Sequence, residues 1–317
     1  MKFRLQDILK VLVSLSALVL IIIFVDFSEI FSGLQKLSVP FVVAALLFYT
    51  GCQWLSCWRW QIILRSTGYR ARMGVLFSSY FGGMFLNTLL PCAVGGDAYR
   101  VYRIAQQSQQ SELAFVSVFL ERITGVFALL AIALISIPPA FSLIGLWDVI
   151  LLLVLCTAMV AGMVMLIASP RLLKFSQPWL NRLKLGVLSE KLSNIQHLLR
   201  VFAQHRLAMA LTLLLSVLFQ LLVVLYYYLI AQQLQISVSY LQLLIFTAII
   251  VAITLLPISL GGLGVKEGLL VYLFSRVGLS AEEAIVLSLT VTALSWLLSL
   301  PGGLVLLLDS TDLKAIR

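Results

Sequence analysis

The stretch "TLLPCAVGGDAYR", residues 88–100, interrupts an apolar region with a proline and a glycine pair, and charged residues follow at once. The chain repeats this pattern in "TLLPISLGGLGVKE", residues 254–267. Six of nine positions are identical between 88–96 and 254–262, including the proline and both glycines. Because proline removes a backbone hydrogen-bond donor and glycine weakens a helix, each stretch predicts a helix that breaks. We therefore interpret the two breaks as related elements; the alternative is a coincidence of two kinked helices.

The composition places these breaks in a membrane protein. Hydrophobic residues make up 62% of the 317 residues and charged residues only 11%, whereas ordinary globular domains carry about 25% charged residues. Roughly 20 apolar residues cross the hydrocarbon core as a helix. Uninterrupted spans are predicted at 8–25, 41–58, 113–137, 149–168, 208–231 and 281–308. The fold class is therefore an all-α polytopic membrane protein in a single integral membrane domain, residues 1–317.

Basic residues predict how the chain is oriented. The net charge of +9 comes from cations beside apolar spans, which indicates membrane topology and excludes a nucleic-acid-binding surface. Basic residues precede the first span, follow the second and occur throughout the connection 170–206. An interfacial helix is expected within this connection, at 189–206. The cations after the second span are Arg59, Arg65, Arg70 and Arg72. These loops, and both termini, are predicted to be cytoplasmic, in a multi-pass protein of the inner (cytoplasmic) membrane.

The two broken segments then enter from opposite sides. The first half, 8–137, contains the broken segment 76–106, and the second half, 208–308, contains the broken segment 242–276. If both segments are re-entrant, three complete spans separate them, and an odd number of crossings inverts the repeat. Inverted repeats with Pro- or Gly-broken helices in corresponding positions indicate a transporter with its substrate site near the bilayer midplane.

Charged residues gather at these breaks, although a charge inside the bilayer is costly. Asp97 and Arg100 follow the first break, Glu121 and Arg122 interrupt the third span, and Lys266 and Glu267 follow the second break. Helix N-termini and arginines favour a phosphate group, so Arg100, Arg122 and Lys266 are candidates to hold an anionic headgroup. An internal ion-pair network with the three acids is the alternative. Neighbours on a helix point about 100° apart, so Glu121 and Arg122 should pair with other segments.

The motifs "LPCAVGGDAYR", "FLERITG" and "PISLGGLGVKEG", in this order, resemble the flippase-like membrane domain of the lysylphosphatidylglycerol synthase family over roughly residues 8–308. The resemblance implies movement of a phospholipid across the cytoplasmic membrane. In the synthases a separate soluble domain attaches the amino acid; because the chain ends in "LLLDSTDLKAIR", a stand-alone member without that domain is expected. The resemblance carries a substrate-binding role to Pro91, Gly95, Gly96, Asp97, Arg100, Glu121, Arg122, Pro257, Gly261, Gly262, Gly264, Lys266 and Glu267.

The predicted function is a lipid translocase that moves an anionic phospholipid or polyprenyl-linked headgroup through a polar cavity at the broken helices. Two alternatives stay open: an integral-membrane enzyme acting on a lipid phosphate or lipid-linked sugar, and a non-catalytic membrane partner of a lipid-modifying enzyme. The sequence shows no clear convergent acidic pair, histidine cluster or nucleotide-binding loop, so no enzymatic activity, cofactor, catalytic residue or metal site is expected. Besides lipid, the expected partners are a second copy of the chain or a lipid-modifying enzyme.

Overall fold

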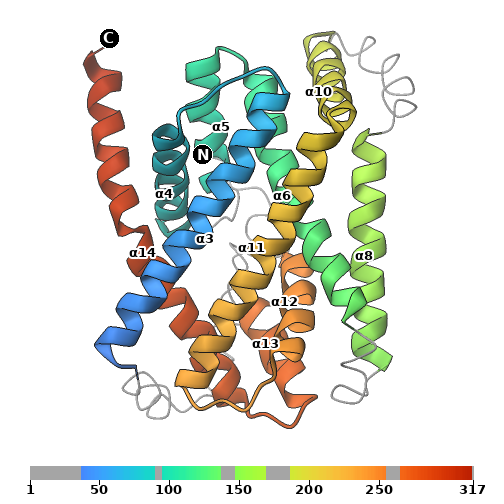
Figure 1. Cartoon of the computed structure of the whole chain (residues 1–317), viewed down its shortest axis with the longest axis vertical. Helices are drawn as coiled ribbons and strands as arrows, with labels where there is room; N and C mark the ends of the chain where they lie inside the picture. Colours follow the sequence, from blue (N-terminus) through green and yellow to red (C-terminus); the bar gives the residue numbers. More distant parts are fainter. Residues whose placement is uncertain (1–36, 90–94, 137–146, 169–185, 255–264, 316–317) are drawn as a thin grey trace, which may run out of the picture.

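The computed structural model describes residues 37–89, 95–136, 147–168, 186–254 and 265–315, and this part of the chain is helical, without strands (Figure 1). The helices are α3 (Val39–Ser66), α4 (Met73–Leu89), α5 (Gly95–Ser108), α6 (Ser111–Ile135), α8 (Trp147–Ala168), α10 (Gly186–Gln204), α11 (Arg206–Gln233), α12 (Tyr240–Thr254), α13 (Val265–Ser275) and α14 (Ala281–Ala315).

Four of these helices are long and apolar enough to cross a membrane, in agreement with the predicted spans at 41–58, 113–137, 208–231 and 281–308. They are α3, α6, α11 and the portion of α14 from Ala281 to Leu308. Helix α8 coincides with the expected span at 149–168. The first expected span, 8–25, lies outside the described residues, so the total of six stays a prediction. The chain is a multi-pass helical membrane protein.

Local signals explain where several helices begin and end. At the start of α12, Ser239 and Gln242 form a reciprocal capping pair, with 2.8 and 3.2 Å between each side-chain oxygen and the other residue's amide nitrogen. Ser280 and Glu283 do the same for α14, at 2.8 and 3.1 Å. Such pairs satisfy amides that the first turn leaves free. Helix α3 stops before Gly68, whose φ of +96° suits the left-handed residue that commonly follows a helix.

The described helices on either side of each predicted break are separate elements. Helix α4 ends at Leu89 and α5 begins at Gly95, while α12 ends at Thr254 and α13 begins at Val265. The longest of these four helices, α4, has 17 described residues and reaches about 25 Å, less than the hydrocarbon thickness of about 30 Å. In Figure 1, α4 and α5 occupy the upper half of the molecule and α12 and α13 the lower half. This arrangement agrees with opposite entry, and the re-entrant assignment itself stays a prediction.

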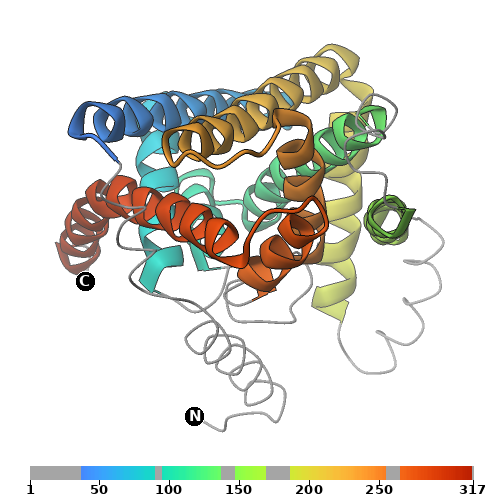
Figure 2. The same ribbon diagram turned by 90° about the horizontal axis from the view of Figure 1, so that it is seen from below.

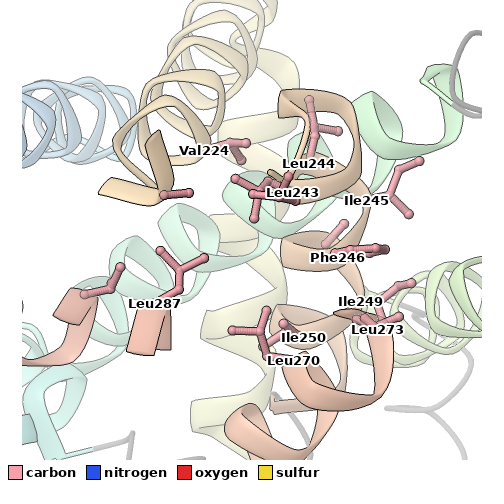
Figure 3. Close-up of a cluster of buried hydrophobic side chains, with 14 of the residues drawn as sticks. Val224, Leu243, Leu244, Ile245, Phe246, Ile249, Ile250, Leu270, Leu273 and Leu287 are labelled. Carbon is pink, nitrogen blue, oxygen red and sulfur yellow. The ribbon is translucent and has the colours of Figure 1, made fainter. Parts of the chain in front are cut away.

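The main apolar core joins the second broken pair to its neighbours. Figure 3 shows Leu243, Phe246 and Ile249 of α12 in one cluster with Leu270 of α13 and with side chains from α11 and α14. Each of these four residues is at most 4% exposed. In a membrane, such buried side chains stabilise helix association through van der Waals contact, because lipid tails are as apolar as the side chains themselves. The short helices α12 and α13 are thus fixed by protein around them.

Two of the helix contacts that link the halves of the chain are α3 with α11 and α4 with α14. Helices α3 and α11 run side by side, as Figures 1 and 2 both show. Helices α4 and α14 approach even more closely at Gly302, where a Cβ atom would overlap the backbone carbonyl of Phe81. Small residues permit this close approach of membrane helices. Helix α4 of the first half is therefore held directly by the last helix of the second.

Helix α10 corresponds to the predicted interfacial helix, but its apolar face is covered by protein. Phe202 is 4% exposed and packs with Ile63 of α3 and with Val116 and Leu120 of α6. Ile195 and Leu199, on the same face, pack against this cluster. The amphipathic pattern of this helix thus reflects contact with α3 and α6 rather than with lipid alone.

Candidate functional site

A polar cavity of about 280 Å³ lies among α3, α4, α5, α6, α11 and α12. Five charged residues line it: Arg59, Asp97, Arg100, Glu121 and Arg122. The described lining thus has three cations against two carboxylates. Because the helices around it include three candidate membrane spans, this cavity brings a surplus positive charge into a segment of the protein that excludes most charges.

Glu121 lies at the centre of the cluster. Its Oε2 accepts a hydrogen bond from Arg100 at 2.8 Å, and its Oε1 accepts from Arg59 in a second ion pair. The hydroxyl of Tyr80 donates to Oε1 at 2.8 Å, and that of Ser56 at 3.1 Å. The Glu121 side chain is only 4% exposed. A buried carboxylate with this many donors is stabilised as an anion and holds both guanidinium groups in place.

The two arginines are also held by aromatic rings. The guanidinium carbon of Arg100 lies 3.9 Å from the ring centre of Tyr80 and 4.2 Å from that of Trp60. Arg59 lies 5.2 Å from the ring centre of Phe219 and donates to Ser216 at 3.0 Å. Cations stack favourably on aromatic faces, most strongly where water is excluded. Arg59 and Arg100 are therefore parts of a rigid, buried wall.

Arg122 occupies a different position on the same cavity. The sequence pairs it with a segment other than its neighbour Glu121, and the structure confirms this: Arg122 Nε lies 2.5 Å from Oδ2 of Asp97 on α5. The Arg122 side chain is 42% exposed, whereas that of Arg100 is 5% exposed. Asp97 Oδ1 also lies 3.4 Å from Nη1 of Arg100. Asp97 therefore links the buried cluster of Arg59, Glu121 and Arg100 to the accessible Arg122.

The first broken pair brings these side chains together through a close backbone contact. The amide of Gly96 donates to Asn87 Oδ1 at 2.7 Å, between α5 and α4. A Cβ atom at position 96 would overlap the carbonyl of Gly83, so only glycine fits here. Asp97 and Arg100 follow within one turn of this contact. The glycine in the predicted motif thus fixes where the charged residues of α5 stand.

The structure separates the predicted site residues into three groups. Gly96, Asp97, Arg100, Glu121 and Arg122 line the cavity, and Gly95 begins the helix that carries the first three. Lys266 and Glu267, on α13, are absent from its described lining. The remaining predicted residues, Pro91, Pro257, Gly261, Gly262 and Gly264, lie outside the described residues.

Lys266 and Glu267 instead contact α14. Lys266 Nζ lies 3.4 Å from Thr292 Oγ1, and the hydroxyl of Ser288 donates to Glu267 Oε1 at 3.1 Å. Glu267 is 5% exposed. Among the described residues, Arg100 and Arg122 therefore lie on the cavity while Lys266 contacts α14, and a joint role of the three cations stays a prediction.

Arg59 is a correction to the sequence prediction. The sequence places it in a cytoplasmic loop after a span ending at 58, whereas α3 continues to Ser66 and buries Arg59 to 3% exposure. The apolar residues Ile62 to Leu64, which follow Arg59, were the available signal that the helix continues. Ser56, Tyr80 and Asn87 were also missed, because isolated hydroxyl and amide residues in apolar helices carry no pattern of their own.

Comparison with known proteins adds a family match. Residues 8–303 match the family described as lysylphosphatidylglycerol synthase TM region. A UPF0104 membrane protein of Methanothermobacter thermautotrophicus is 27% identical over 290 residues, covering 82% of this chain and 80% of that protein. Another, from Pyrococcus horikoshii, is 24% identical over 300 residues, covering 86% and 88%. Glycosyltransferase AglD of Haloferax volcanii is 34% identical over 131 residues, which are 41% of this chain and 20% of AglD. No solved structure matches significantly.

Proposed function

This chain belongs to the family of the lysylphosphatidylglycerol synthase TM region, and from that premise we propose that it is a lipid translocase. In this proposal an anionic phospholipid or polyprenyl-linked lipid passes its headgroup through the cavity while its tails remain in the bilayer. The family and the similarity to AglD support a membrane function related to lipids. The translocase proposal adds that the protein moves the lipid across the membrane without changing it chemically.

The observation that carries the proposal is the surplus cation of the cavity. The three arginines in its described lining exceed the carboxylates by one, so a single negative charge neutralises the site. A lipid phosphate diester supplies one such charge, and guanidinium groups hold two phosphate oxygens at once. Arg122 presents that charge, because its side chain is 42% exposed. Asp97 is the internal anion that the headgroup phosphate replaces on Arg122.

Glu121 has a positioning role in this proposal. Both of its oxygens are engaged, one by Arg100 and the other by Arg59 together with hydroxyl groups. A general base needs a free oxygen within reach of a substrate proton, so this carboxylate is poorly arranged for the enzymatic alternative. We therefore prefer the translocase to the enzymatic alternative and expect no cofactor.

The partial similarity to AglD favours one further candidate, a non-catalytic membrane partner of a glycosyl-transferring or other lipid-modifying enzyme. The similarity covers a fifth of AglD. In such an assembly the cavity would present a lipid-linked substrate to the enzyme without moving it across. This candidate shares the lipid-binding cavity with the translocase and differs only in whether the headgroup reaches the other leaflet.

For location we propose the inner (cytoplasmic) membrane, with both termini on the cytoplasmic side. Figure 1 supports one part of this: the C-terminal ends of α3 and α14, the start of α11 and helix α10 all lie toward the same end of the molecule. Exposed Arg65, Arg70 and Arg72 lie on or just after the end of α3. Basic residues gather on the cytoplasmic side of membrane proteins, so this end is assigned to the cytoplasm.

Reconstitution in liposomes separates the candidates. Purified protein is inserted into vesicles that contain headgroup-labelled phosphatidylglycerol, or a polyprenyl phosphate, on one leaflet, and exposure of the label to an impermeant quencher is followed. Transfer above protein-free vesicles supports the translocase. A chemically changed lipid, detected by mass spectrometry, would establish the enzyme instead. Binding with neither transfer nor product supports the membrane partner.

A further inference from the structure

A second hollow lies at the end of the molecule assigned to the cytoplasm. It has a volume of about 500 Å³ and is formed by the last turn of α3 and the junction of α10 with α11. Arg65, His205 and Arg206 line its polar part, and Ile62, Leu207 and Leu211 its apolar part. It shares no lining residue with the central cavity. We call it the α3–α11 groove.

The charge of the groove is unbalanced. Its described lining contains two arginines and no acidic residue. Among the residues that the structure describes, neither the Arg65 nor the Arg206 side chain has an ion-pair or hydrogen-bond partner, and both residues are exposed. The positive end of the α11 dipole adds to their potential. Two guanidinium groups directed at one hollow without a protein anion complement a phosphate group.

The apolar part of the groove continues along α11. Leu207, Leu211, Leu214 and Leu218 follow at intervals of four, three and four residues, so they share one helical face. All four are exposed, from 39% at Leu211 to 74% at Leu207. Because α11 is a candidate membrane span, this leucine face is directed at lipid tails. A cationic hollow thus stands at the head of an apolar stripe, the same order of groups as in a phospholipid.

We propose that the α3–α11 groove binds an anionic phospholipid of the cytoplasmic leaflet, with its phosphate at Arg65 and Arg206 and an acyl chain along the leucine face of α11. The occupant is a membrane lipid because a free phosphate would make no use of the leucine face. This site is separate from the translocase cavity and does not depend on transport. It holds a lipid at the edge of the protein, where α3 and α11 meet.

The test measures lipid binding to purified protein by native mass spectrometry, with dioleoylphosphatidylglycerol and dioleoylphosphatidylcholine as probes. In Arg65→Gln/Arg206→Gln, affinity for the phosphatidylglycerol should fall about tenfold, with phosphatidylcholine binding unchanged. The matched control is Arg70→Gln/Arg72→Gln, which removes the same charge from exposed positions outside the groove; it should bind like wild type. Equal losses in both pairs, or no loss in either, would overturn the site.

Further measurements separate loss of charge from loss of folding, and a lipid from a free phosphate. Arg65→Lys/Arg206→Lys preserves charge and should lose only part of the affinity; it also serves if the Gln pair fails to fold. Soluble glycerol 3-phosphate should not compete at concentrations that match the lipid, and equal competition would overturn the assignment to a lipid. The Gln pair is also compared with its parent in the Arg122→Gln background, where the central cavity lacks its accessible cation; the loss caused by the pair should persist there, so failure of the groove and failure of the translocase are separable.

Discussion

Arg122 of α6 and Asp97 of α5 form an ion pair that faces the central cavity, while the neighbouring Glu121 and Arg100 form theirs inside the protein. The exposed fractions are 42% and 21% for the first pair, and 4% and 5% for the second. Exposed pairs contribute little to stability, whereas breaking a buried pair is costly. Substitution in the first pair should therefore cost little folding stability, and the same kind of substitution in the second pair should cost much more.

Arg122→Gln should abolish lipid transfer and leave folding intact. The free energy of unfolding should change by less than about 1 kcal/mol, because the pair with Asp97 is partly exposed. Transfer in liposomes and thermal unfolding in detergent are measured on the same preparation. The control is Arg72→Gln, at an exposed loop position, which should behave as wild type. Normal transfer by Arg122→Gln would remove Arg122 from the substrate path.

Glu121→Gln should instead destabilise the protein, by about 3–5 kcal/mol, because Arg59 and Arg100 would remain buried without their anion. Chemical unfolding in detergent measures this. Glu112→Gln, at the start of the same helix, is the control and should cost less than about 1 kcal/mol. In the double variant Arg59→Gln/Glu121→Gln the losses should not add, because both residues belong to one network. If Glu121→Gln were as stable as wild type, this carboxylate would not be what holds Arg59 and Arg100 in place.

Gly96→Ala should impair both folding and transfer. The added methyl group would meet the backbone carbonyl of Gly83, which cannot rotate away, so α5 must move from α4 and take Asp97 and Arg100 with it. Gly74→Ala, on α4, is the matched control, since no atom lies within 4 Å of its Cβ position. The control should melt at or slightly above the wild-type temperature. Wild-type transfer by Gly96→Ala would show that this close contact does not set the site.

Gly302→Ala should loosen the contact between the two halves. Its Cβ would overlap the carbonyl of Phe81 on α4, and overpacking of this kind typically costs about 1–3 kcal/mol. The control is Gly268→Ala on α13, where no atom lies within 4 Å. Thermal unfolding of both variants in the same detergent gives the comparison. Equal melting temperatures would mean that α4 and α14 can separate freely.

The proposed orientation predicts labelling in intact cells. In a cysteine-free background, Arg72→Cys should resist an impermeant thiol reagent and react only after the membrane is opened. Ser237→Cys, in the exposed turn between α11 and α12, should react without opening. The reverse pattern would invert the topology, since the two positions lie at opposite ends of the helices.

The sequence was informative where a pattern repeats and silent where a single residue acts at a distance. The two Pro and Gly-Gly stretches predicted where one described helix ends and the next begins, because the backbone cost of these residues is local. The triad of Arg59, Glu121 and Arg100 could be predicted only in part. Arg59 and Glu121 are 62 residues apart, and a lone arginine near the end of an apolar run reads as the end of the span. Only packing of α3 against α6 shows that it is inside.

Lys266 illustrates the opposite case. Repeat symmetry placed it with Arg100 in one cluster, since both follow equivalent breaks. The described structure gives it a contact with Thr292 of α14 instead. In the described residues, the side chains that follow the two breaks therefore have different neighbours, because each pair of short helices packs on different helices.

The uneven count of charges around the central cavity has an electrical consequence. With three arginines and two carboxylates, the cavity is positive when empty and neutral when it holds a monoanionic headgroup. Moving one elementary charge across a membrane potential of 100 mV changes its free energy by about 2.3 kcal/mol. If the charged wall moves between the two faces of the membrane, voltage acts on the return of the empty protein and leaves the loaded step unaffected. A membrane potential would then govern how quickly the protein resets for its next lipid.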